Sequence, residues 1–405
     1  MFILKSIFKT SLIKNLNNKI PSKSFSDLND IVELSEDHKM IYETALNFAK
    51  ENMAPHALEW DKKSYFPIEV IRQAAQLGFG SIYTSQEYGG CGMDRLSASL
   101  IFEALATACV STSAYLSIHN MNCWIIDSFG NEEQKKEWLP QLINMEKLTS
   151  YCLTEPGSGS DAGAMKTFAK KVGGDYIING SKCFITGGGV SDYYILVCLT
   201  GEKQRSVIFV PKDAQGMSFG NPEIKMGWKS SPTAVVNLED VKVPVRNLIS
   251  EEGNGFKIAM MGLDGGRINI ASTSIGGASF CLDKTKDYLF NRRQFGKNLG
   301  DFQHLQFQYA QMITDFTLSR LMVRQAAVKI DQKDPNRALY AAMAKLTATE
   351  KCYNTVDICL QMHGGYGYIW ETGIERFLRD LRVNRILEGT TEIMKHIIAR
   401  TTLKQ

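Results

Sequence analysis

Hydrophobic residues recur at intervals of three and four in two long parts of the chain, and this spacing predicts helices. The first part covers residues 36–148, where residues such as Ile41, Ala45 and Phe48 share one helical face. The second part begins after Gly253 and continues to the end of the chain. Both parts are therefore expected to be helical.

Between residues 151 and 249 the hydrophobic period changes to two, which predicts β-strands. The predicted strands, rich in β-branched and aromatic residues, are 175–179, 181–185, 193–199, 206–210 and 235–243, with the first two joined by an Asn179-Gly180 turn. Helices, then strands, then helices predict a mostly helical α+β protein. The alternating β-α-β units of a doubly wound nucleotide fold are not found.

Charge and cysteine usage exclude several classes of protein. The 405 residues include 46 Lys and Arg against 43 Asp and Glu, a balance too even for a dedicated nucleic-acid binder. No apolar run approaches the roughly 18 residues of a membrane span. The nine cysteines are scattered without a CxxC pair, which indicates reduced thiols. The six histidines form no cluster either, so we expect no metal site.

The first 26 residues differ from the rest of the chain. They contain five lysines and no acidic residue, and their apolar residues can form one helical face opposite the lysines. A cationic amphipathic helix is typical of a mitochondrial presequence, whereas the alternative is a basic disordered tail. We expect residues 1–26 to direct the protein to the mitochondrial matrix.

The segment Tyr151–Ala162, YCLTEPGSGSDA, lies where the helical period gives way to the β period. Gly157, Gly159 and Ala162 match a G-x-G-x-x-A spacing, but a dinucleotide fingerprint needs a strand before it and a helix after it. A tight loop whose amides and small hydroxyls approach a flat or phosphorylated ligand is the better interpretation. An ordinary domain-boundary loop is the alternative.

Two other features carry candidate chemistry. Phe184, Ile185 and Thr186 precede a run of glycines and could form a platform for a planar ring, or be a core strand followed by a loop. Glu388 is flanked by Ile386 and Leu387, and an apolar neighbourhood raises the pKa of a carboxyl group and suits a base that removes a proton. The alternative is a solvated glutamate at a helix end.

Three separated motifs together resemble the acyl-CoA dehydrogenase family. They are YCLTEPGSGSD at 151–161, R-x-Q-F-G at 292–296, and QMHGGYGY at 361–368 followed by RD at 379–380 and ILEGTTE at 386–392. Their order and spacing match the family, and the resemblance covers the chain after about residue 30. It implies an N-terminal α-helical domain (27–150), a middle β-barrel domain (151–250) and a C-terminal four-helix bundle domain (251–405).

The resemblance also implies FAD, held between the β domain and the bundle and usually completed by a neighbouring subunit of a homotetramer. The residues expected to contact FAD are Tyr151, Cys152, Leu153, Thr154, Glu155, Pro156, Gly157, Ser158, Gly159, Ser160, Phe184, Ile185, Thr186, Arg292, Phe302, Gln303, Gln361, Met362, His363, Gly364, Gly365, Thr390, Thr391 and Glu392. Those expected to contact the acyl-CoA are Ser160, Asp264, Gly265, Gly266, Arg267 and Arg400. Arg292 is expected to pair with the FAD diphosphate, because its planar donor fork binds phosphate oxygens well.

The resemblance implies Glu388 as the base. Isovaleryl-type members take their base from the residue immediately before the arginine of the G-R-I-N helix, and this residue is Gly266 here. Other family members take their base from a glutamate nearer the C-terminus, and the matching residue here is Glu388, in the motif at 386–392. Phe184 replaces the tryptophan common in the family, and its aromatic ring can still stack on a flavin.

Residues 262–271 and 319–324 are most similar to the branch of the family that acts on isobutyryl-CoA. We therefore expect a flavoenzyme of valine catabolism that oxidises isobutyryl-CoA to methacrylyl-CoA and passes electrons to electron-transfer flavoprotein. The same chemistry on 2-methylbutyryl-CoA or butyryl-CoA, an acyl-CoA oxidase, and a non-catalytic helical scaffold are the alternatives.

Overall fold

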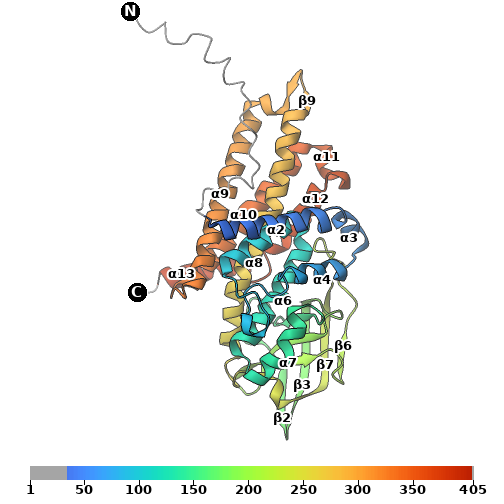
Figure 1. Ribbon diagram of the computed structural model, residues 1–405, viewed down its shortest axis with the longest axis vertical. Helices are drawn as coiled ribbons and strands as arrows, with labels where there is room; N and C mark the ends of the chain where they lie inside the picture. Colours follow the sequence, from blue (N-terminus) through green and yellow to red (C-terminus); the bar gives the residue numbers. More distant parts are fainter. Residues whose placement is uncertain (1–33, 404–405) are drawn as a thin grey trace, which may run out of the picture.

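A computed structural model describes residues 34–403, and the presequence expected at residues 1–26 lies outside this range. Helices from the two ends of this range pack together, and a β domain lies at one end of the molecule (Figure 1). The N-terminal helices are α2 (Glu36–Phe48), α3 (Ala57–Lys63), α4 (Ile68–Gln76), α5 (Arg95–Ala106), α6 (Val110–Phe129) and α7 (Glu132–Ile143).

Side-chain caps explain where several of these helices begin. The Asp94 side chain accepts a hydrogen bond from the Ser97 amide at the start of α5. At α7, Asn131 and Gln134 form a reciprocal capping box. Each cap satisfies an amide that has no partner within its own helix.

The middle domain is one mixed eight-stranded sheet. Its strands are β1 (Thr149–Cys152), β2 (Phe168–Val172), β3 (Asp175–Thr186), β4 (Tyr193–Leu199), β5 (Arg205–Pro211), β6 (Met217–Phe219), β7 (Thr233–Pro244) and β8 (Leu248–Ile249). The hydrogen-bonded order is β6-β7-β3-β2-β4-β5-β8, with β1 parallel to β4. This ordered path begins at β6 and ends at β8, and the sheet forms the middle β domain expected from the sequence.

The predicted turn at Asn179-Gly180 is wrong, because residues 175–186 form the single strand β3. The Asn179 side chain bonds Asp240 on the neighbouring strand β7 instead of closing a turn. Gly180 has φ +148° at a register shift, and a Cβ there would lie 2.7 Å from the Thr167 Cα. Glycine therefore permits a bulge and a close backbone approach rather than a hairpin.

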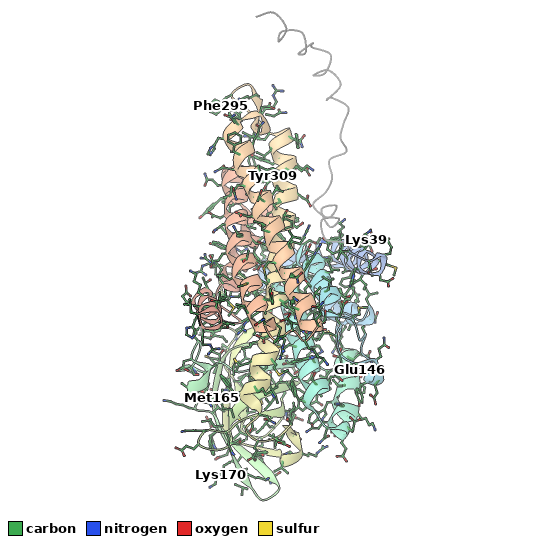
Figure 2. The ribbon with its side chains drawn as sticks, turned by 90° about the vertical axis from the view of Figure 1, so that its left-hand side faces the viewer. Lys39, Glu146, Met165, Lys170, Phe295 and Tyr309 are labelled. Carbon is green, nitrogen blue, oxygen red and sulfur yellow. The ribbon has the colours of Figure 1, made fainter. Side chains whose placement is uncertain are left out.

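The C-terminal part is a helical bundle. Its elements are α8 (Gly255–Asn291), the hairpin β9 (Arg293–Gln294) and β10 (Lys297–Asn298), α9 (Gln303–Asp331), α10 (Arg337–His363), α11 (Gly365–Tyr368), α12 (Ile374–Asn384) and α13 (Thr391–Thr402). Helices α8, α9 and α10 pack side by side, and α12 and α13 pack on α10. In Figure 2 Phe295 marks the bundle tip, at the opposite end of the molecule from Lys170 in the β domain.

One hydrophobic cluster joins the β domain to the helices that lead to the site. The Trp138 ring of α7 stacks on Phe209 of β5 with centroids 4.1 Å apart. Ile258 of α8 and Met121 of α6 belong to the same buried cluster. This packing places α6, α8 and the sheet around one space and confirms the mostly helical α+β architecture. Within residues 34–403 no helix is long and apolar enough to cross a membrane.

Candidate active site

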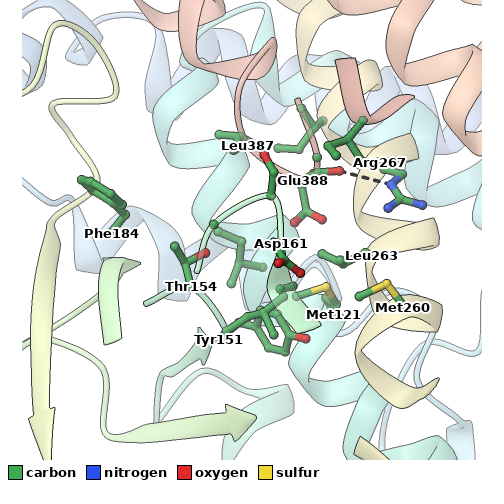
Figure 3. Close-up of a pocket in the computed structure, with 18 of the residues that line it drawn as sticks. Met121, Tyr151, Thr154, Asp161, Phe184, Met260, Leu263, Arg267, Leu387 and Glu388 are labelled. Atoms are coloured by element: carbon green, nitrogen blue, oxygen red, sulfur yellow. Dashed lines mark hydrogen bonds between the residues drawn. The ribbon is translucent and has the colours of Figure 1, made fainter. Parts of the chain in front are cut away.

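A cavity of about 670 Å³ lies where β1, β3, α6, α8 and α13 meet. Figure 3 shows Glu388, Arg267, Tyr151 and Phe184 around it. The predicted site residues that line it are Tyr151, Leu153, Thr154, Gly159, Ser160, Phe184, Ile185, Thr186, Arg267, Glu388 and Arg400. Segments far apart in the sequence thus converge as we expected.

Glu388 lies in the tight turn between α12 and α13. Glu388 has φ +54° and Gly389 has φ +93°, so two successive residues are left-handed. The Glu388 carbonyl accepts a 3.2 Å hydrogen bond from Arg267 Nε, and the Gly389 carbonyl accepts a 2.7 Å bond from Lys345 Nζ. Thr390 then caps α13. The turn projects the Glu388 side chain into the cavity (Figure 3).

The Glu388 carboxyl group is poorly solvated. The residue as a whole is only partly buried, but Oε2 is buried and has no hydrogen-bond partner among residues 34–403. Burial raises the pKa of Glu388 to about 7, although the charges of Arg267 and Lys345 act to lower it. The burial of Oε2 favours a buried base over a solvated helix-end glutamate, and the pKa shift has the direction expected from the sequence.

Helix α8 brings the acyl-CoA candidates to this turn. A Cβ added at Gly266 would lie 2.7 Å from Glu388 Oε2, so the glycine leaves room for the carboxyl group. Arg267 is 4% exposed and pairs with Asp264 at 2.7 Å. Burial raises the pKa of Asp264, and the positive charge of Arg267 acts to lower it. Gly265 faces the Arg95 guanidinium instead of the cavity.

The loop that follows β1 is anchored by a buried ion pair. Glu155 accepts bonds from the Lys166 and Thr167 amides and from Lys182 Nζ, the last at 2.8 Å. Lys182 is fully buried and also donates to the Leu153 carbonyl. Burial raises the pKa of Glu155, but these hydrogen bonds outweigh it and the net pKa is lowered. The pair therefore orders the loop from behind the cavity.

Other predicted members of this loop do not line the cavity. Cys152 is fully buried in the sheet core, and the Ser158 hydroxyl donates to the Asp161 carbonyl. Pro156 and Gly157 are exposed. Their expected contact with FAD stays a prediction.

Phe184 is an exposed aromatic side chain at the end of β3. It has φ +56°, is 68% exposed and lines the cavity. A non-glycine residue in this left-handed region is uncommon and is typical of functional sites. The Phe184 ring therefore lies at the cavity wall, and its role as a platform for a planar ring stays a prediction.

The remaining FAD candidates lie elsewhere. A second cavity of about 460 Å³ at the bundle tip is lined by the predicted residues Arg292, Gln361, Met362, His363, Gly364 and Gly365. The His363 ring stacks on Tyr288, and its Nε2 is buried without a partner among the described residues. Phe302 packs near Phe295 close to this tip, and Gln303 begins α9. The two cavities share no lining residue.

Residues 390–392 lie next to the base rather than at the tip. Thr391 donates to Glu350 of α10, and Glu392 is in the first turn of α13.

The RD motif at 379–380 has a structural role. The Trp228 amide donates to Asp380 at 2.6 Å, and Arg379 binds Asp61. Burial raises the pKa of Asp380 to about 6.

The sequence did not single out several residues that shape the site. They are Ile118, Met121, Trp228, Met260, Leu263, Ile393 and His396 in the cavity wall, and Lys182 and Lys345 behind it. Met260, Leu263 and Arg267 have the spacing of residues on one helical face. This spacing was the only feature of the sequence that could have placed Met260 and Leu263 beside Arg267. No local pattern marks the buried lysines. Across residues 34–403 no cluster of three potential metal ligands occurs.

Comparison with known families agrees with this geometry. Three family models match consecutive parts of the chain: the acyl-CoA dehydrogenase N-terminal domain at 35–146, the middle domain at 150–241 and the C-terminal domain at 253–403. The chain therefore belongs to the acyl-CoA dehydrogenase family of oxidoreductases, as the three motifs predicted.

Individual relatives are similar over nearly the whole chain. The mitochondrial isobutyryl-CoA dehydrogenase of Dictyostelium discoideum is 50% identical over 98% of this chain and 97% of its own length. The mitochondrial isobutyryl-CoA dehydrogenase of Bos taurus is 50% identical over 92% of this chain and 90% of its own. The solved structure of butyryl-CoA dehydrogenase from Megasphaera elsdenii superposes with a TM-score of 0.89 at 35% identity, covering 92% of this chain and all of that one.

Proposed function

We propose that the protein is an FAD-dependent dehydrogenase that converts isobutyryl-CoA to methacrylyl-CoA, with Glu388 as the base. The observation that carries this proposal is the carboxyl group of Glu388, whose Oε2 is buried and unpartnered inside the 670 Å³ cavity. The names of the two relatives at 50% identity support isobutyryl-CoA as the substrate.

The residues present fit FAD. The first cavity offers a wide apolar space, the Phe184 ring and the hydroxyls of Thr154, Ser160 and Thr186 for a flavin. The tip cavity offers the Arg292 guanidinium and the unpartnered His363 Nε2 for a nucleotide. A Cβ at Gly364 or Gly365 would meet nothing within 4 Å, so this backbone is open to a ligand.

The division of the expected FAD residues between two separate cavities supports an oligomer. They lie on different elements and share no lining residue, whereas a single FAD needs both a flavin site and a nucleotide site. One FAD would therefore contact the first cavity of one subunit and the tip of another, within a homotetramer. Light scattering of the purified protein tests this assembly: a monomer that binds FAD fully would contradict it.

The reaction needs a base that touches the α-carbon. The unpartnered Oε2 of Glu388 takes the α-proton of the thioester, and a pKa of about 7 leaves a useful fraction ionised at neutral pH. When bound, FAD supplies the chemistry that accepts the hydride from the β-carbon, so that a carbon–carbon double bond forms and two electrons leave the substrate. The Glu388 amide would donate to the thioester oxygen as its negative charge develops.

Apolar side chains form part of the cavity wall around this base. Met121, Met260 and Leu263 line the same space as Glu388 and are apolar. Excluding water strengthens the electrostatic interactions inside the site and prevents side reactions. Because one methylene changes binding in such a pocket by only about 1–3 kcal/mol, related short substrates compete closely.

Steady-state kinetics across C4 and C5 acyl-CoAs tests the proposal. We expect purified protein to be yellow and to have its highest kcat/KM with isobutyryl-CoA. Higher kcat/KM with butyryl-CoA or 2-methylbutyryl-CoA would overturn the substrate assignment, and a colourless protein would favour a non-catalytic scaffold. Oxygen uptake with substrate alone would identify an oxidase.

Electron-transfer flavoprotein is the proposed acceptor, and the mitochondrial matrix the proposed location. The names of the mitochondrial relatives support the organelle. Reduction of purified electron-transfer flavoprotein by substrate and enzyme tests the partner, and fractionation of mitochondria tests the location. Activity only with artificial acceptors would contradict the partner.

A further inference from the structure

Lys345 is a buried cation beside the active site that the proposed chemistry does not use. It lies on α10, is fully buried, and donates a 2.7 Å hydrogen bond from Nζ to the Gly389 carbonyl. Lys345 forms no ion pair with a carboxylate among residues 34–403. A buried, unpaired ammonium is costly, so its presence next to this turn calls for a functional explanation.

The turn that Lys345 contacts needs external support. Glu388 is a non-glycine residue at φ +54°, a conformation that persists only where the surroundings hold it. Arg267 of α8 binds the Glu388 carbonyl, and Lys345 of α10 binds the next carbonyl along the chain. Two cations on two long helices therefore hold successive peptide groups of the turn that carries the base.

We propose that Lys345 is a positioning residue for Glu388. By holding the Gly389 carbonyl it fixes the direction of the Glu388 side chain, and its positive charge favours the ionised base. This inference rests on the proposed function, in which Glu388 removes the α-proton. It adds a residue of α10 to a site that otherwise consists of β1, β3, α6, α8 and α13.

Several charged or titratable groups surround Glu388. The groups that line the same cavity are Tyr151 of β1, Asp161 of the loop after β1, Arg267 of α8, and His396 and Arg400 of α13. Arg267 and Lys345 are the groups whose charges lower the pKa of Glu388, and Asp264 already partners Arg267. Burial lowers the pKa of Lys345 to about 8, and the positive charge of Arg267 acts in the same direction. The negative charges of Glu388, Glu350 and Glu392 oppose this shift.

The structure therefore predicts a specific effect on pH dependence. Removing the charge of Lys345 leaves Arg267 alone to stabilise the Glu388 carboxylate, so the pKa of Glu388 rises. The acid limb of kcat/KM then moves to higher pH, because a larger fraction of the base is protonated at a given pH. A lysine that only stabilises the fold would change the melting temperature without moving this limb.

The experiment compares K345M, K345R and a control, K351M, as full-length holoenzymes. K351M removes a lysine from the same helix that pairs with the half-buried Asp315, away from the cavity. FAD content, melting temperature, and kcat and KM over about pH 5–9 are measured with the preferred acyl-CoA. We expect K345M to keep FAD and KM, to lose about 10-fold or more in kcat, and to shift its acid limb upward. K345R should restore the position of the limb, and K351M should match the wild type.

Two results would overturn the inference. One is a folded K345M holoenzyme with the wild-type kcat and acid limb. The other is a kcat that falls together with the melting temperature while the limb stays in place. If K345M does not fold, K345Q carries the same test, because it also removes the charge. Wild-type preference for another acyl-CoA would refute only the substrate assignment, since the Lys345 variants are compared on whichever substrate is turned over.

Discussion

The carboxyl group of Glu388 lies directly against the α-carbon of Gly266. A Cβ at position 266 would be 2.7 Å from Oε2 and 2.9 Å from Oε1, closer than non-bonded atoms approach. These are the two positions from which family members are expected to take their base. The structure places these two positions side by side, so only one can carry a large side chain.

This relationship predicts that the base can be moved. We expect E388G to lose most activity, by roughly 10²–10⁴-fold, and G266E/E388G to recover at least about 10-fold of it. In G266E/E388G a carboxylate enters the space that the Glu388 side chain has left. The check is kcat with isobutyryl-CoA at equal FAD content. A folded G266E/E388G protein no more active than E388G would refute the shared position.

Substituting the base itself gives the simplest test. E388Q keeps the size of the side chain and removes its capacity to accept the proton, so we expect it to retain FAD and to lose turnover by about 10²–10⁴-fold. E146Q, an exposed glutamate of the N-terminal domain, is the matched control and should be unchanged. Full activity in E388Q would remove Glu388 from the mechanism.

The raised pKa of Glu388 predicts how activity depends on pH. Since the base must be ionised, kcat/KM of the wild type should rise with pH through about 7. An acid limb near pH 4.5, the ordinary value for a glutamate, would show that the carboxyl group is solvated in the working enzyme.

The raised pKa of Glu388 also makes the stability of the protein depend on pH. The folded state binds the Glu388 proton more tightly than the unfolded state, so this group's contribution to stability is lost as pH rises from about 4.5 to about 7. In E388Q that loss should disappear. Urea unfolding of both proteins across this window measures the difference, and parallel curves would contradict it.

The buried pair behind the loop predicts a role for Lys182. Removing one partner of a buried ion pair leaves the other uncompensated, so K182M should lower the free energy of unfolding by about 3 kcal/mol and reduce FAD content. The control is K242M, which breaks the exposed pair with Asp175 and should cost less than about 1 kcal/mol. Urea unfolding and the FAD-to-protein ratio are measured. A K182M protein with wild-type FAD content would show that the pair does not order the loop.

Much of the fold was predictable because the hydrophobic period is a local property. The strand predicted at 193–199 coincides with β4, and the change from a period of about 3.6 to one of two marked the β domain. The Asn179-Gly180 turn was wrong for a physical reason. An Asn-Gly pair permits a hairpin but does not require one, and here pairing with β7 along the whole strand decided the outcome.

The site was predictable only in part. The loop after β1, Phe184 and Glu388 line one cavity as expected, but Arg292 and His363 line another at the bundle tip. A motif identifies residues that share a ligand, whereas it does not say whether one chain brings them together. In an oligomer they can come from different subunits.

The sequence by itself determined the order of helices and strands, the family and the identity of the candidate base, because periodicity and motifs are read from neighbouring residues. Only the tertiary structure decided that Glu388 faces Gly266, that Oε2 is buried, and that Arg267 and Lys345 hold its turn. Arg267 and Glu388 are 121 positions apart. Burial and charge at Glu388 depend on such distant contacts, which packing creates and no local pattern encodes.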